Sequence, residues 1–255
     1  MYFSIITGSK NTAQFLPKNL KSVTRQTYND YEHIIIDGHS TDGSVKLIKT
    51  YIRSNPGKVK YYSLPPKGIS NAFNEGVNRA SGRYLLFLNS DDYLYDNDTL
   101  KEVQSFLSHN VNLDWIYGKI NVIESNGKKI GIFPERKVFQ LANATLLKYV
   151  NYIPHQAVFI KRSIFSKFGL YDENISSKMD YEYWLRITKK TKWKFYNNII
   201  SNYTIRKGSQ TASIKNVEEN RLNLDKVRSK YLNVTDKFIA AKFDYLLRKY
   251  HKTLR

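Results

Sequence analysis

The sequence contains no cysteine among its 255 residues. This absence excludes disulfide bonds, thiolate metal sites and a cysteine nucleophile, and it fits a protein of a reducing compartment. The opening residues, MYFSIITGSK, have no basic segment before their short apolar run, so they do not resemble a secretory signal. No stretch approaches the roughly 18 apolar residues that a membrane-spanning helix needs. We therefore expect a soluble, cytoplasmic protein.

Acidic residues are scarce relative to basic ones. The chain has 22 Asp and Glu against 41 Lys and Arg, a formal net charge of +19. Such an excess predicts attraction to an anionic partner, which could be nucleic acid, an anionic bilayer or a phosphate-bearing substrate. Hydrophobic residues make up 41% of the chain, which is enough for a packed core and argues against global disorder.

The first 110 residues alternate between strand and helix patterns. Strands are expected at 2–7, 31–37, 59–63 and 83–89, and helices at 11–25, 44–53 and 69–80, the second capped by Asp42 or Ser44. Strands this apolar are usually buried on both faces. The alternation therefore predicts an α/β fold, an open and mostly parallel sheet flanked by helices.

The alternation of strand and helix patterns ends after residue 110. Two extended segments, 115–124 and 128–133, flank the turn Ser125-Asn126-Gly127 and predict a hairpin. Further helices are expected at 162–168 and 180–188, an extended segment at 193–206, and helix from 216 onward with a break near Asn233. We interpret 1–215 as a catalytic domain, with halves 1–110 and 111–215, and 216–255 as a basic helical extension at the C-terminus.

Polar clusters follow three of the predicted strands. They are DGHSTDG at 37–43, Lys67-Gly68 with the helix start Ser70-Asn71, and NSDD at 89–92. Ligands of open α/β sheets bind at the carboxyl ends of the strands, so these clusters could converge on one crevice.

The NSDD segment is the most informative of the three. Asp91 and Asp92 are adjacent carboxylates, which repel one another unless a cation or donor compensates. Mg²⁺ or Mn²⁺ would bind one or two such carboxylates and keep positions for diphosphate oxygens. An acidic turn that caps the next helix is an equal alternative.

Three other side chains have two interpretations each. Asp37 could accept hydrogen bonds from a base or ribose, or simply end its strand. His155 lacks HExxH spacing and is either structural or part of a site. Asp180 is either a helix N-cap or a general base. Glu182, two residues on, points to another side of the helix and cannot share that task.

Together these segments resemble glycosyltransferase family 2, whose members have a GT-A-type fold. The resemblance covers roughly residues 1–210 and rests on motifs in the right order. The matching segments are SIIT (4–7), LKSV with QTY (20–28), IDGHSTDGS (36–44), KGISNAFNEG (67–76), ASGR leading into FLNSDD (80–92), and HQ (155–156) with DYEYWLR (180–186).

The resemblance implies roles for individual residues. Asp37 would hold the nucleotide base, Asp91 would ligate Mn²⁺ or Mg²⁺ with Asp92 beside it, and Asp180 would be the catalytic base. The remaining donor-side contacts would be Thr7, Lys67, Asn71 and Ser90, and the acceptor or diphosphate side would include His155, Gln156 and Arg206.

The chain departs from the family pattern at three positions. Asn89 replaces the first acid of the metal-binding motif, which leaves metal binding to Asp91. Asn71 stands where many relatives carry Asp, which would change contacts to the donor. His39 replaces a glycine, so the turn after the second strand is expected to differ.

The implied reaction is an inverting transfer of a sugar from a nucleotide-diphospho-sugar, in the first place a UDP-sugar, to an acceptor hydroxyl. The implied setting is bacterial surface polysaccharide assembly, with a saccharide acceptor that is free or lipid-linked. Two alternatives stay open: a metal-dependent nucleotidyltransferase, although its Gly-rich N-terminal loop is missing, and a basic nucleic-acid-binding protein, although no recognisable motif supports it. The oligomeric state is open, a homodimer included.

The C-terminal segment carries an apolar stripe at helical spacing, surrounded by basic residues. The stripe consists of Ile239, Phe243, Leu246, Leu247, Tyr250 and Leu254. Such a helix could lie on an anionic membrane surface, at the inner face of the cell membrane. Packing of the stripe on its own domain or on a second subunit is the alternative.

Overall fold

The computed structural model of the chain describes residues 1–141, 143–175, 177–205 and 216–253. Its strands are β1 (Phe3–Ser9), β2 (Tyr31–Asp37), β3 (Val59–Ser63), β4 (Tyr84–Phe87), β5 (Tyr93–Leu94), β6 (Trp115–Glu124), β7 (Lys129–Phe133), β8 (Val158–Lys161) and β9 (Trp193–Ile205). Its α-helices are α1 (Leu16–Thr24), α2 (Ser44–Ser54), α3 (Ile69–Arg79), α4 (Thr99–His109), α5 (Ala144–Leu147), α6 (Arg162–Phe168), α7 (Met179–Ile187), α8 (Asn216–Tyr231) and α9 (Val234–Thr253).

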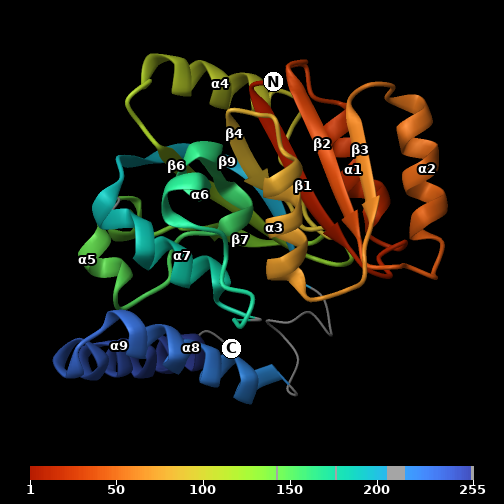
Figure 1. The fold of residues 1–255 in the computed structure, drawn as a ribbon. Helices are drawn as coiled ribbons and strands as arrows, with labels where there is room; N and C mark the ends of the chain where they lie inside the picture. Colours follow the sequence, from red (N-terminus) through yellow and green to blue (C-terminus); the bar gives the residue numbers. More distant parts are fainter. Residues whose placement is uncertain (142, 176, 206–215, 254–255) are drawn as a thin grey trace.

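The described strands form one sheet of mixed direction. The strand order is β3-β2-β1-β4-β8-β6-β9-β5, and β7 pairs with β6 outside this path. Strands β3, β2, β1 and β4 run parallel to one another, whereas β8 is antiparallel to both β4 and β6. The expected α/β fold, a helix-flanked sheet with a C-terminal helical extension, is confirmed (Figure 1). The first 110 residues supply the parallel block β3-β2-β1-β4, and β6 and β9 form a second parallel pair.

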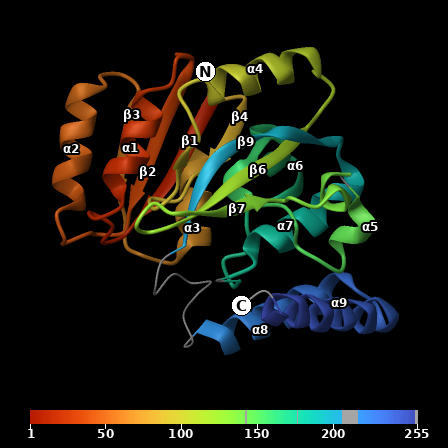
Figure 2. The same ribbon diagram turned by 180° about the vertical axis from the view of Figure 1, so that it is seen from behind.

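Helices cover both faces of the sheet. Along β1, Ile6 packs with residues of α3, α6 and α7, whereas Phe3 and Ile5 pack with residues of α1 and α4 on the opposite face. Figures 1 and 2 show these two layers from opposite sides, with α3, α6 and α7 in front of the sheet in Figure 1. Because successive side chains of a strand point to opposite faces, a strand between two helix layers has its side chains buried on both faces. This explains why all seven residues of β2 are buried.

The C-terminal helices α8 and α9 pack beneath the sheet and its flanking helices (Figures 1 and 2). The contact with α7 centres on Glu182, whose side chain is fully buried and accepts hydrogen bonds from Lys230 Nζ (2.9 Å) and from the Tyr231 hydroxyl. On α9, Asp236 accepts from Lys148 Nζ (2.7 Å) and from the Tyr149 hydroxyl (2.8 Å). The extension is therefore docked on α7 and on the segment that follows α5. No helix in the described ranges is long and apolar enough to cross a bilayer.

Three local predictions differ from the structure. The expected helix over 11–25 starts only at Leu16, since a turn around Thr12 precedes it and a proline follows at the helix start. The N-cap of α2 is Gly43, with φ +97°, rather than Asp42 or Ser44. The Asp42 carboxylate still accepts from the backbone N–H of Ser44, the first residue of α2 (3.0 Å), and its other oxygen accepts from the backbone of Ala13 (2.9 Å). Strand β8 is missing from the sequence-based interpretation, because its four residues, of which three are apolar, are too few to show a periodic pattern.

Candidate active site

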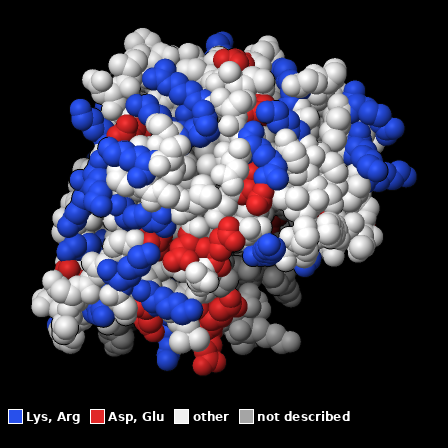
Figure 3. Space-filling model, in the orientation of Figure 1, with Lys and Arg blue, Asp and Glu red and all other residues white. Residues whose placement is uncertain are grey.

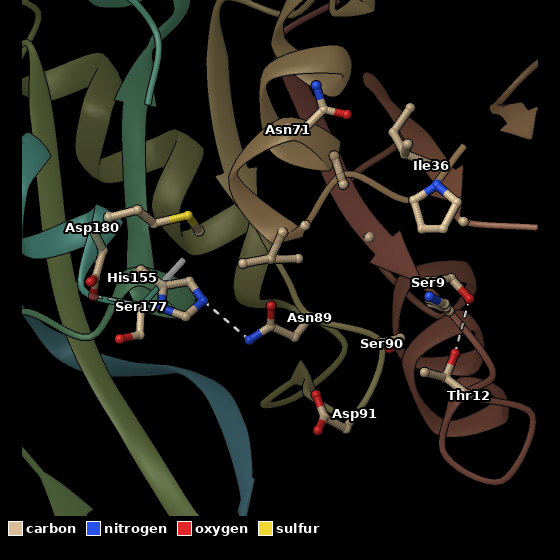
Figure 4. A pocket seen from close by; sticks show the side chains of 18 of the residues that line it. Ser9, Thr12, Ile36, Asn71, Asn89, Ser90, Asp91, His155, Ser177 and Asp180 are labelled. Atoms are coloured by element: carbon tan, nitrogen blue, oxygen red, sulfur yellow. Dashed lines mark hydrogen bonds and ion pairs between the residues drawn. The ribbon is translucent and has the colours of Figure 1, made fainter. Parts of the chain in front are cut away.

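A pocket of about 510 Å³ opens where the parallel strands end. Its walls come from the ends of β1 and β4, the loops after β2 and β3, the start of α7, and the segment around His155. Figure 4 shows Asp91 and Asp180 on different sides of this pocket, with Asn89 and His155 between them. The second and third of the predicted strand-end clusters thus meet at one pocket, and the first contributes only Gly38.

The end of β4 supplies the acidic wall. Ser90 and Asp91 line the pocket, and Asp92, which is fully buried, does not. Asp92 Oδ1 accepts from the backbone N–H of Thr204 (3.0 Å), and Oδ2 accepts from Asn89 Nδ2 (3.1 Å). The two adjacent carboxylates are thus divided between two environments, one at the pocket surface and one inside the protein.

Two lysines line the pocket near the ends of β1 and β3. Lys10 follows β1, Lys67 lies in the loop between β3 and α3, and both side chains are exposed and line the pocket. Gly68, the residue after Lys67, has φ +94° and ψ 171°, a combination that only glycine adopts without strain. This glycine lets the loop turn sharply into α3 and holds Lys67 at the rim. Cations at this position would favour an anionic ligand.

Helix α7 positions Asp180 at the opposite wall. Trp184 is fully buried and stacks on Trp115, with ring centroids 5.3 Å apart, which anchors the helix to the sheet. Asp180 lies in the first turn, where the helix dipole favours a negative charge. The N-cap is Lys178, in the left-handed conformation at φ +72°, so the prediction of Asp180 as N-cap is wrong. Glu182 points away to α8, as its spacing predicted.

His155 lies between Asn89 and Asp180. Its Nε2 is 3.1 Å from Asn89 Nδ2, and its Nδ1 is 3.8 Å from Asp180 Oδ2. Burial lowers the pKa of His155, while the nearby charges of Asp180 and Asp91 act in the opposite direction, and the net result is a pKa below the usual value. Burial therefore favours the neutral form of the imidazole. Asn151 Nδ2 also donates to Asp180 Oδ2, at 3.4 Å.

The structure brings most of the predicted site residues together. Those that line the pocket are Lys67, Asn71, Ser90, Asp91, His155, Gln156 and Asp180. Asn71 does so with its amide nitrogen turned to the carboxylate of Glu173, at 3.0 and 3.1 Å. Arg206 lies outside the described residues.

Two predicted donor contacts lie behind the pocket wall. Thr7 is buried, donates from Oγ1 to the carbonyl of Leu88 (2.8 Å), and does not line the pocket. Asp37 is also buried, and its two oxygens accept from the hydroxyl and the N–H of Ser40 at 2.6 and 2.9 Å. His39 takes up φ +53°, so the histidine adopts the left-handed conformation that a glycine accommodates more easily.

The sequence-based prediction missed several polar pocket residues, among them Lys10, Asn151, Lys178, Tyr203 and Asn220. Asn151 and Lys178 lie within four residues of His155 and Asp180, and this proximity in sequence was the available signal. Tyr203 lines the pocket from β9, and Asn220 from α8. No sequence signal marks Asn220, since it reaches the pocket only because α8 docks on α7. The C-terminal extension is therefore part of the pocket wall.

The model of glycosyl transferase family 2 matches residues 4–169 of this chain. The chain belongs to glycosyltransferase family 2. The matched segment includes Asp91 and His155 and ends before Asp180. A PGL/p-HBAD biosynthesis glycosyltransferase of Mycobacterium tuberculosis is 32% identical over 184 residues, which is 72% of this chain and 68% of that protein. Chondroitin synthase of Pasteurella multocida is 29% identical over 90% of this chain, but only 23% of its own length is matched.

Solved structures agree with the fold of this family 2 glycosyltransferase. Residues 1–349 of S. aureus TarS in complex with UDP-GlcNAc superpose with a TM-score of 0.75 at 19% identity, over 95% of this chain and 71% of that one. A mannosyltransferase from Pyrobaculum calidifontis in complex with GDP-Man and Mn²⁺ superposes with a TM-score of 0.66 at 12% identity, over 98% and 75%. These likenesses support the GT-A architecture.

Proposed function

We propose that this glycosyltransferase transfers a sugar, with inversion, from a nucleoside-diphospho-sugar to an acceptor hydroxyl. One observation carries the proposal: Asp91 and Asp180 line one pocket from different sides (Figure 4), and the exposed side chains of Lys10 and Lys67 also line it. The two lysines suit an anionic diphosphate, the Asp91 carboxylate suits a cation bound to that diphosphate, and Asp180 suits an acceptor hydroxyl. In the P. calidifontis and S. aureus structures the bound donors are GDP-Man and UDP-GlcNAc, which supports this class of ligand.

In the proposed step, the acceptor oxygen forms a bond to the anomeric carbon as the bond from that carbon to the diphosphate breaks. Asp180 takes the acceptor proton, which general-base catalysis requires within hydrogen-bond reach. The leaving diphosphate carries away the bonding electrons, and Lys10 and Lys67 neutralise part of its charge. Attack from the Asp180 side, opposite the diphosphate, inverts the anomeric configuration.

The chain's own residues suit a divalent cation that arrives with the donor. Among the residues that the structure describes, no three His, Asp or Glu side chains converge to hold a metal. Mg²⁺ and Mn²⁺ are commonly held by one or two carboxylates together with substrate phosphates, so the Asp91 carboxylate at the pocket wall fits such an ion. When bound, the cation would add positive charge at the leaving diphosphate. The buried Asp92 would then support the loop rather than bind the ion.

Nucleotide binding is the first test. UDP or GDP with Mn²⁺ should raise the melting temperature, because a ligand that binds only the folded state stabilises it by about 2.7 kcal/mol at a hundredfold excess over Kd. A short oligonucleotide at the same phosphate concentration is the control. Stabilisation by the oligonucleotide alone would favour the nucleic-acid-binding alternative, and pyrophosphate release from a nucleoside triphosphate would favour a nucleotidyltransferase. A screen of nucleotide-sugars, with released nucleotide as readout, would then identify the donor.

We further propose a role in bacterial surface glycan assembly, at the cytoplasmic face of a membrane. The name of the mycobacterial relative, which refers to PGL/p-HBAD biosynthesis, supports a cell-surface glycan setting. The predicted apolar stripe needs revision for its described part, since Phe243 stacks on Tyr149 at 5.8 Å and Ile239 is half-buried. The side chains of Leu246, Leu247, Tyr250 and Leu254 lie outside the described ones.

A different face of α9 is available for a membrane. Val234 and Phe238, one turn apart, are 84% and 62% exposed, and Lys242 lies over the Phe238 ring at 4.6 Å. Lys and Arg side chains are spread over much of the surface seen in Figure 3, while Asp and Glu gather at its lower centre. Exposed apolar side chains beside lysines are typical of interfacial helices.

Liposome flotation tests this attachment in the full-length chain. Phe238→Asp should lower the bound fraction on anionic vesicles about tenfold, because burying a phenylalanine contributes about 1.5–3 kcal/mol. Val111→Asp is the matched control: Val111 is 56% exposed and follows α4, at the opposite end of the molecule (Figure 1). Equal binding of the two variants, or no flotation of the unaltered protein, would contradict the proposal.

A further inference from the structure

We infer that Asn89 sets the tautomer of His155, and that this histidine positions Asp180 by directing its Nδ1–H at the carboxylate. The inference rests on the proposed function for the role of Asp180, but not for the tautomer. It concerns the position where this chain has an amide in place of the first acid of the family's motif. In Figure 4, Asn89 lies between His155 and Asp91, with its amide nitrogen turned to the imidazole.

The orientation of the Asn89 amide follows from its neighbours. Nδ2 is 3.1 Å from Asp92 Oδ2 and 3.1 Å from His155 Nε2. An ionised carboxylate only accepts hydrogen bonds, so the NH₂ end of the amide must face Asp92, and a flipped amide would set two oxygens against each other. The second hydrogen of Nδ2 then points to His155.

The amide nitrogen can only donate, so His155 Nε2 must be the acceptor. A neutral imidazole has one N–H, which places the proton on Nδ1. Nδ1 is the nitrogen that lies 3.8 Å from Asp180 Oδ2. This distance is longer than a hydrogen bond, as is common for catalytic contacts before the substrate binds.

Asp180 is approached at one oxygen by two N–H groups. Asn151 Nδ2 donates to Oδ2 at 3.4 Å, and His155 Nδ1 faces the same oxygen. Donors at Oδ2 restrict rotation of the carboxylate, and we assign the acceptance of the acceptor proton to Oδ1. Asn89 is thus a positioning residue, which acts on Asp180 through His155.

The protein contains a natural internal reference with the opposite tautomer. Thr7 donates its hydroxyl hydrogen to the Leu88 carbonyl (2.8 Å), so it must accept from His33 Nε2, at 3.0 Å. His33 Nδ1 then accepts from the Tyr51 hydroxyl, also at 3.0 Å. Burial lowers the pKa of His33 to about 3, so this ring is neutral as well. One protein therefore has a predicted Nε2–H at His33 and a predicted Nδ1–H at His155.

Long-range ¹H–¹⁵N spectra of histidine-labelled full-length protein near pH 7.5 test the inference without any ligand. The unaltered protein should show His155 with Nδ1 protonated and Nε2 unprotonated, and His33 with the reverse pattern. Spectra of His155→Gln and His33→Gln assign the signals. An Nε2–H tautomer at His155, or rapid averaging of the two, would overturn the inference, and this measurement needs no variant at residue 89.

Two further variants test whether Asn89 sets the tautomer of His155 and whether the Nδ1–H is directed at Asp180. Asn89→Asp replaces the donor by an acceptor, so His155 Nε2 should become protonated while the His33 signals stay unchanged and report an intact fold. Asp180→Asn should move the His155 Nδ1–H resonance upfield, because a neutral amide is a weaker acceptor than a carboxylate. An unprotonated Nε2 in Asn89→Asp, or an unmoved Nδ1–H in Asp180→Asn, would refute the arrangement. Failure of the proposed function would appear instead as normal turnover in Asp180→Asn, whatever the tautomer.

Discussion

Asp180→Asn should lower turnover by about 10²–10⁴-fold, the usual contribution of a general base. Asparagine keeps the size of the side chain but cannot take the acceptor proton. The helix should remain folded, because Trp184 and the buried Glu182 hold α7 in place. The measurement is the rate of acceptor-dependent nucleotide release with the donor that the nucleotide-sugar screen identifies, at saturating donor and at several pH values.

The matched control is Asp225→Asn, the same change on the exposed face of α8, away from the pocket lining. It should leave turnover unchanged. Nucleotide binding should be similar in both variants, since Asp180 faces the acceptor side. A near-normal rate with an unaltered pH profile in Asp180→Asn would show that this carboxylate is only part of the helix start.

Asp91→Ala should lower turnover by about 10²–10³-fold and abolish the stabilisation by Mn²⁺ together with UDP or GDP. A cation at the leaving diphosphate contributes several kcal/mol to the transition state, and about 1.4 kcal/mol corresponds to a factor of ten in rate. Asp91 lines the pocket and is only partly buried, so the melting temperature of the ligand-free protein should change little. Differential scanning fluorimetry with and without Mn²⁺ and nucleotide measures both effects.

A variant of the neighbouring Asp92 provides a comparison for the effect of Asp91→Ala on stability and on the response to Mn²⁺. Asp92 is fully buried and accepts from the Thr204 N–H and from Asn89, so Asp92→Asn should destabilise the ligand-free protein by about 1–3 kcal/mol, the cost of an impaired buried hydrogen-bonding group. Any folded fraction should keep its response to Mn²⁺ and nucleotide. The reverse pattern, with Asp92→Asn losing the cation response and Asp91→Ala keeping it, would transfer the metal role to Asp92.

Most elements of the first 110 residues could be predicted, because their signal is local. The run YEHIIID is long and apolar enough to indicate a doubly buried strand, and β2 has the bounds Tyr31–Asp37 that this run predicts. Short elements could not be predicted, because they carry too little local signal. Strand β8 has four residues and β5 has two, so their existence depends on the partners beside which they pair.

The neighbouring sequence could not predict which of the polar side chains at the strand ends line the pocket. Asp91 and Asp92 are adjacent in the chain, yet one lines the pocket and the other is sealed behind it by Thr204 of β9, 112 positions away. Asp37 likewise ends its strand at the expected place, and the N–H and hydroxyl of Ser40 donate to its two carboxylate oxygens. The sequence pattern predicts that a polar residue ends a strand. Hydrogen bonds to residues distant in the sequence decide whether its side chain faces the pocket.

The sequence by itself determined the family, the helix-flanked sheet and the two carboxylates of the proposed chemistry, because ordered motifs and apolar periodicity are properties of the chain. Only the tertiary structure placed Asn220 of α8 in the pocket wall and Asn89 between Asp92 and His155. Docking of α8 on α7 depends on Glu182 meeting Lys230 and Tyr231, 48 and 49 positions away. Contacts at such separations result from the packing of whole elements, and no local pattern encodes them.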